Sequence, residues 1–81
     1  MEAMNNKGVN LHLDIDKGTV SITGLLADTM VYLYDSHGKL KAKSQYILSS
    51  LVFALSEYGV YVLVMSHPNC QPEVRRLVYR G

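Results

Sequence analysis

The chain of 81 residues is poor in several features, and each shortage excludes a class of structure or function. Cys70 is its single cysteine, so no internal disulfide can form. The longest uninterrupted apolar run, GVYVLVM at residues 59–65, is much shorter than the roughly 20 residues that span a bilayer. Basic and acidic residues nearly balance at a net charge of +1, which does not favour nucleic acid or an acidic membrane as a partner.

The remaining composition is that of one small globular domain. Hydrophobic residues make up 48% of the chain and charged residues 19%, a balance that favours a packed core over disorder. The leading MEAMNNKG lacks the basic-then-apolar pattern of a signal peptide. We expect residues 1–8 to be a flexible N-terminal segment and residues 9–80 to form a single domain.

Apolar residues recur at every second position between regularly spaced turn signals, a pattern typical of β-strands. The clearest case is VNLHLDID, which places four apolar residues on one face: Val9, Leu11, Leu13 and Ile15. DKG at residues 16–18 predicts a turn through its aspartate and glycine. Val20 and Ile22 then face inward in TVSITGL, so the two segments form a hairpin, and LLAD at 25–28 connects the sheets.

The middle of the chain continues the alternation. TMVYLYD places Val31 and Leu33 on one face, and DSHG at residues 35–38 predicts a type I turn. In KLKAKSQY we expect Leu40 and Ala42 to face inward and three lysines to face outward as protection of a sheet edge: Lys39, Lys41 and Lys43. ILSSLVFAL fits helical and strand spacing equally well, but it lacks a capping box and lies between strand signals, so we predict a strand.

These segments, with VRRLVYR at residues 74–80, predict an all-β fold: a seven-stranded immunoglobulin-like sandwich of two antiparallel sheets. Tyr61 follows Gly59 at the place where sandwich domains carry a tyrosine whose hydroxyl bonds back to a corner.

The segment YGVYVLVMSH, residues 58–67, is apolar on both faces. A strand with one face in solvent would instead alternate apolar and polar residues. One interpretation is structural: a central strand whose second face is covered by a loop, by the N-terminal segment or by large neighbours. The other is functional: an apolar patch that binds a protein partner or a second copy. The residues that would carry such contacts are Val60, Val62, Val64, Tyr32 and Tyr34.

Motifs for catalysis or metal binding are weak. The spacing of His67 and Cys70 would allow them to be two metal ligands, or a thiol nucleophile and its base. A structural zinc site, however, needs four ligands. A catalytic thiol needs an oriented base and a substrate pocket. The aspartates at 14, 16, 28 and 35 form no run of spaced calcium ligands. We therefore predict a protein that is not an enzyme and that holds no metal or other cofactor, with a small metal protein or enzyme using His67 and Cys70 as a minor alternative.

The basic residues would form a stripe for nucleic acid only if the fourth and last strands lay close together, with Tyr46 and Tyr79 free to stack on bases. The members of that stripe would be Lys39, Lys41, Lys43, Arg75, Arg76 and Arg80. The near-neutral net charge favours solubility and edge protection instead, so we expect no nucleic-acid partner.

Three segments resemble small sandwich domains of Bacteroidetes secreted proteins. In those domains a strand ending in Tyr-Asp leads through a glycine-containing turn into a Lys/Arg-Leu strand, and a Leu-x-x-x-Gly-x-Tyr stretch and a basic-apolar final strand follow. The first piece is matched by VYLYDSHGKL at Tyr34, Asp35, Gly38, Lys39 and Leu40. The second is matched by LSEYGVYVLVM at Leu55, Gly59 and Tyr61. The third is matched by VRRLVYR at Arg75, Arg76, Leu77 and Val78. Two families share the pattern: secreted immunoglobulin-like domains of unknown function from gut Bacteroidetes, and the C-terminal sorting domain of the type IX secretion system.

The resemblance implies a non-enzymatic interaction module that is secreted, periplasmic or on the cell surface. It also implies an alternative, a sorting domain read by a secretion apparatus. In that case the last strand would be the recognised element, through Arg75, Arg76 and Arg80.

Overall fold

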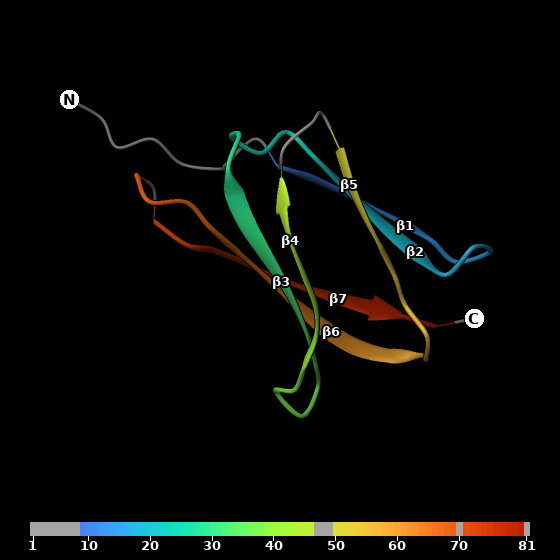
Figure 1. Cartoon of the computed structure of the whole chain (residues 1–81). Helices are drawn as coiled ribbons and strands as arrows, with labels where there is room; N and C mark the ends of the chain where they lie inside the picture. The colour runs from blue at the N-terminus through green and yellow to red at the C-terminus, as the bar shows by residue number, and fades with distance from the viewer. Residues whose placement is uncertain (1–8, 47–49, 70, 81) are drawn as a thin grey trace.

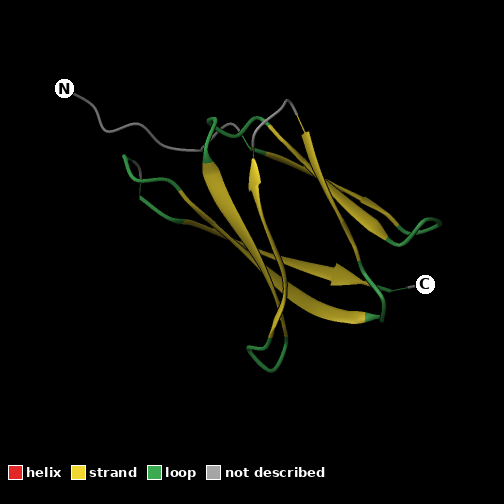
Figure 2. Ribbon diagram, in the orientation of Figure 1, coloured by secondary structure: helices red, strands yellow, loops and turns green. Residues whose placement is uncertain are grey.

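The computed structural model describes residues 9–46, 50–69 and 71–80, and these form seven β-strands without a helix (Figures 1 and 2). Their bounds are Asn10–Asp14 (β1), Thr19–Thr23 (β2), Thr29–Asp35 (β3), Leu40–Tyr46 (β4), Ser50–Ala54 (β5), Gly59–Ser66 (β6) and Glu73–Tyr79 (β7). Among the described residues, none belongs to a helix of the length and apolarity that a membrane span requires. The N-terminal segment predicted as flexible, residues 1–8, lies outside the described residues.

The strands form two antiparallel sheets, with the orders β1-β2-β5 and β4-β3-β6-β7. In Figure 1 the three-stranded sheet lies at the upper right and the four-stranded sheet below it. The predicted all-β, seven-stranded sandwich is confirmed. The fourth strand pairs with β3 in the second sheet, whereas in constant-type immunoglobulin domains it belongs to the first.

The core lies between the sheets and consists of the residues at alternate positions of the strands. Six of its apolar side chains are almost fully buried: Val20, Ile22, Val31, Leu33, Leu63 and Met65. Thr29 is the one polar residue buried with them among the described residues, and its hydroxyl donates to the Leu26 carbonyl at 2.7 Å. The inward sides predicted for β2 and β3 are therefore confirmed, and β6 points Leu63 and Met65 into the core.

The ambiguous segment at residues 47–55 contains strand β5 and no described helix. β5 pairs along its whole length with β2, and Phe53 and Leu55 point into the core. Residues 47–49 lie outside the described part. The strand is favoured because its apolar positions 51, 53 and 55 all fall on the side facing the other sheet.

The first hairpin turns one residue earlier than its sequence indicates. β1 ends at Asp14, whose Oδ1 accepts the backbone N–H groups of Asp16 and Lys17, each at 3.1 Å. Ile15 therefore lies in the turn and is exposed, so its predicted place on the inner face is wrong. Asp14, not Asp16, organises the turn, and Gly18 closes it at a positive φ of 65°.

The second hairpin confirms the predicted turn at residues 35–38. Gly38 donates its N–H to the Asp35 carbonyl at 3.1 Å and has a φ of 79°. After the turn, Leu33 pairs with Ala42 but Tyr34 pairs with Leu40, so Lys41 is the extra residue of a β-bulge. The bulge reverses the alternation: Leu40 is exposed opposite Tyr34, and the predicted inward position of Leu40 is wrong.

The corner between β5 and β6 contains the tyrosine predicted from the sequence. The Tyr61 hydroxyl donates to the carbonyl oxygen of Glu57 at 2.7 Å, and the Tyr61 ring is buried. Gly59 has a positive φ of 147°, a backbone conformation that glycine adopts without steric cost. Because β5 and β6 belong to different sheets, this hydrogen bond fixes the turn that joins them.

Candidate interaction face

The outward side of the four-stranded sheet brings the five predicted contact residues together. Tyr32 lies opposite Val64, and Tyr34 lies opposite Val62, in the pairing of β3 with β6. Val60 continues the same side of β6. Directly opposite residues share one face of a sheet, so these five side chains form a continuous surface. We call this side of the sheet the interaction face.

The face extends over both neighbouring strands. On β7, Val78 lies opposite Val60 and Val74 opposite Val64, while on β4 Leu40 lies opposite Tyr34. The predicted residues are each half-buried, because they occupy the two central strands. The three residues on the edge strands are more open: Val74 is 59% exposed, Val78 44% and Leu40 43%. Contiguous exposed apolar surface of this kind marks interaction sites more often than single exposed residues do.

The structural interpretation of the doubly apolar strand holds in part, and the functional interpretation stays a prediction. β6 is a central strand, and the neighbouring tyrosines partly cover its second side. The apolar surface nevertheless continues outward to exposed valines at the edge. The two-residue alternation of VRRLVYR puts Val74 and Val78 on the same side of β7, but only the pairing of β7 with β6 adds them to the interaction face.

The charged residues of the face are all basic. Lys43 lies opposite Tyr32 on β4, and Arg76 lies opposite Val62 on β7. No outward position of these four strands carries aspartate or glutamate. Asp28 lies near one end of the face, where its Oδ1 accepts a hydrogen bond from Gln45 Nε2 at 3.5 Å. The face therefore has an apolar centre with a cation on each edge strand.

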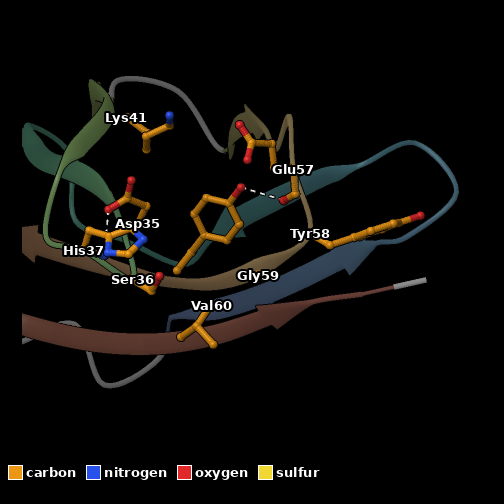
Figure 3. Close-up of a pocket in the computed structure, with 9 residues that line it drawn as sticks. Asp35, Ser36, His37, Lys41, Glu57, Tyr58, Gly59 and Val60 are labelled. Atoms are coloured by element: carbon orange, nitrogen blue, oxygen red, sulfur yellow. Dashed lines mark hydrogen bonds between the residues drawn. The ribbon is translucent and has the colours of Figure 1, made fainter.

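A second feature is a polar pocket of about 190 Å³ at the end of the sandwich, between the β3–β4 turn and the β5–β6 corner. Figure 3 shows Lys41 above Asp35 on one side and Glu57 on the other. Lys41 is exposed, as predicted, and lines this pocket, while the bulge interrupts the alternation that relates it to Lys43.

Asp35 is used by the backbone of its own turn. Its Oδ1 accepts the N–H groups of Lys39 and His37, each at 2.9 Å. The hydrogen bond from Lys39 is the largest cause that holds the pKa of Asp35 below its usual value of 3.8, followed on the lowering side by the bond from His37. The low pKa therefore reflects a structural turn and does not indicate a catalytic acid.

The candidate metal and catalytic residues do not form a cluster in the described part of the chain. The Nδ1 atom of His67 accepts the Asn69 backbone N–H at 3.1 Å, and Cys70 lies outside the described residues. Asp14 and Asp35 belong to turns of different sheets. Within residues 9–46, 50–69 and 71–80, no three histidine, aspartate, glutamate or cysteine side chains come close enough to hold a metal ion.

The basic stripe considered for nucleic acid is not formed. β4 and β7 are the opposite edges of one sheet, with β3 and β6 between them, so their lysines and arginines lie apart. Tyr46 and Tyr79 are both buried in the core and cannot stack on bases. The edge position predicted for the lysine-bearing strand is confirmed, because β4 ends the order of its sheet.

The last strand separates the three arginines considered for sorting. Arg75 is half-buried, and its Nε bonds Glu73 Oε2 at 2.7 Å. Arg76 is exposed on the interaction face, and Arg80 is exposed just after β7. β7 is itself an edge strand of the described sheet.

Comparison with known proteins supports the fold. No protein-family model matches the sequence, and no curated protein is significantly similar to it. Among solved structures, the chain is similar to PorZ, described as an essential bacterial surface component of the type IX secretion system of Porphyromonas gingivalis, from the human oral microbiome. The match has a TM-score of 0.80 at 19% sequence identity, and it covers 91% of this chain. It spans 12% of the PorZ chain, so the likeness concerns one small part of that protein.

Proposed function

We propose that this chain is a non-enzymatic interaction module, secreted or on the cell surface, that binds a protein partner through the interaction face. The observation that carries the proposal is the apolar surface that continues across all four strands of one sheet. An inward-facing core needs only one apolar side of each sheet, so the second apolar side has no part in closing the sandwich.

Two further points support the cellular location in this proposal. The sequence resembles small secreted immunoglobulin-like domains of Bacteroidetes, and the fold is similar to a part of PorZ, a bacterial surface component. We propose that the chain belongs to that family and that it is secreted, periplasmic or on the cell surface. We also propose that it has no enzymatic activity.

Site-specific photo-crosslinking in the producing cells tests the interaction face. We would place a benzophenone side chain at Val74, on the face, and in a second protein at Val52 of β5. These valines are 59% and 55% exposed and lie on opposite sheets, which makes them matched positions. We expect a discrete adduct with one protein from position 74 and none from position 52. Equal labelling from both positions, or none from position 74, would remove the interaction face from the proposal.

A type IX sorting domain is the second candidate. The observation that favours it is the position of β7, a sheet edge that carries Arg76 and is followed by the exposed Arg80. The test is to fuse the chain to the C-terminus of a periplasmic reporter in a bacterium that has type IX secretion. Sorting predicts that the reporter reaches the cell surface and that Arg76→Ala with Arg80→Ala retains it in the periplasm. A reporter that stays in the periplasm with the unchanged chain excludes this candidate.

A further inference from the structure

The apolar centre of the interaction face is too small to hold a stable partner alone. Strands lie about 4.8 Å apart and rise about 3.4 Å per residue, so four strands by the five residues of 60–64 cover roughly 19 Å by 17 Å, or about 320 Å². A standard interface buries about 800 Å² on each partner. A bound partner must therefore extend beyond this area. Because the area already includes both edge strands, the partner also covers Lys43 and Arg76.

Those edges select the charge of the partner. Lys43 and Arg76 lie on opposite edge strands, and no outward strand position supplies an acidic side chain to either of them. A partner that covers a cation without an opposing carboxylate removes the water around that cation. The lost hydration free energy is then not offset by an ion pair. A partner with carboxylates beside its apolar contacts gains complementary charge at both edges.

A second copy of this chain does not meet that requirement. Two interaction faces laid against each other bring four cations together and no carboxylate from a strand position, and Asp28 lies only near one end of each face, where it accepts from Gln45. Like charges across an interface act against the wrong partner. The charge pattern thus disfavours self-association through this face.

We infer that the interaction face binds a different protein, one that presents apolar side chains flanked by aspartate or glutamate. This inference rests on the proposed function, which requires only that the face binds a protein. It adds the sign of the partner's charge and assigns the face to a partner other than a second copy.

Two synthetic helical peptides of about 18 residues test the inference, since their length of about 27 Å spans the face. Both carry the same leucine stripe, flanked by glutamate in one peptide and by lysine in the other. We would titrate each into the full ¹⁵N-labelled chain and follow amide shifts. We expect the glutamate peptide to bind at least about tenfold more tightly, with shifts on β3, β6 and β7, and the difference to shrink at high salt because screening weakens rim charges.

Charge reversal provides the matched variants. Arg76→Glu changes a cation on the face, and Lys17→Glu makes the same change of charge in the exposed β1–β2 turn of the other sheet. We expect Arg76→Glu to weaken the glutamate peptide about tenfold and Lys17→Glu to change its affinity by less than about twofold. Amide spectra of both variants confirm that each remains folded.

The other outcomes overturn the inference in distinguishable ways. If both peptides bind the face equally, the charge preference is wrong and the proposed function stands. If neither binds while position 74 still cross-links to a protein, the acidic partner is again wrong. If cross-linking also fails, the proposed function fails with it. A wild-type molar mass of two chains that Val62→Lys reduces to one identifies a second copy as the occupant and overturns the inference.

Discussion

The two sheets of this sandwich share one core but have outer faces of opposite character. The outward positions of the three-stranded sheet are mostly polar: Asn10, His12, Asp14, Thr19, Ser21, Thr23, Ser50, Val52 and Ala54. The corresponding side of the four-stranded sheet carries valines, tyrosines and Leu40 between two cations. A polar outer face is therefore sufficient for this fold, and the apolar one needs an explanation other than folding.

The largest expected effect separates the two sides of a single strand. Leu63 is fully buried between the outward residues Val62 and Val64. We expect Leu63→Ala to lower the free energy of unfolding by about 2–5 kcal/mol and Val62→Ala by about 1 kcal/mol or less, as measured by urea denaturation. Leu63→Met conserves volume and should cost less than about 1.5 kcal/mol. Equal costs at positions 62 and 63 would mean that the outward side is part of the core.

The next effect contrasts the two outer faces in binding. Val62→Lys places a charge in the apolar centre of the interaction face, while Val52→Lys places one on the polar sheet. We expect the first to weaken the glutamate peptide at least about tenfold and the second by less than about twofold. Circular dichroism checks that both variants fold. If Val52→Lys weakens binding as much, the two faces do not differ in function.

A smaller effect concerns the corner where the chain passes from one sheet to the other. Tyr61→Phe removes the hydroxyl that donates to the Glu57 carbonyl, and we expect it to cost about 0.5–1.5 kcal/mol of stability in thermal or urea unfolding. Tyr34→Phe removes a hydroxyl from the interaction face and should change stability by less than about 0.5 kcal/mol. A neutral Tyr61→Phe would show that the corner does not depend on this hydrogen bond.

The smallest effect is the acid sensitivity of the hairpin turn in the four-stranded sheet. N–H donors from Lys39 and His37 stabilise the Asp35 carboxylate in the folded chain and lower its pKa. The unfolded chain therefore takes up this proton more readily, so the contribution is present above about pH 4 and is lost as pH falls below the usual pKa of 3.8. Urea denaturation at pH 5 and pH 3 should show a smaller acid loss in Asp35→Asn than in the wild type. Equal losses would contradict the assignment.

Much of the fold could be predicted from local pattern. The Asp35–Gly38 turn, the tyrosine of the corner and the inward sides of β2 and β3 follow from turn chemistry and two-residue spacing. The errors occur where a local irregularity breaks the period. Ile15 is exposed because Asp14 starts its turn early, and Leu40 lies on the outward side because of a bulge at Lys41. A strict alternation cannot foresee either event, since one inserted residue reverses every side chain near it.

For the candidate site, the sequence identified five residues of the interaction face but missed its edge. Val60, Val62 and Val64 stand out as a second apolar side on one strand, and Tyr32 and Tyr34 alternate on another. Leu40, Val74 and Val78 join them only through the pairing of β4 with β3 and of β7 with β6. The same pairing places two strands, β3 and β6, between Lys43 and Arg76. The basic stripe considered for nucleic acid is therefore not formed.

The amino-acid sequence by itself determined which side of each strand is apolar, because successive side chains of a strand point in opposite directions. Only the tertiary structure decided which strands are neighbours, since pairing between distant segments depends on how both sheets close over one core. That order turned separate alternating segments into one apolar face with a cation at each edge, and left the face of the other sheet polar.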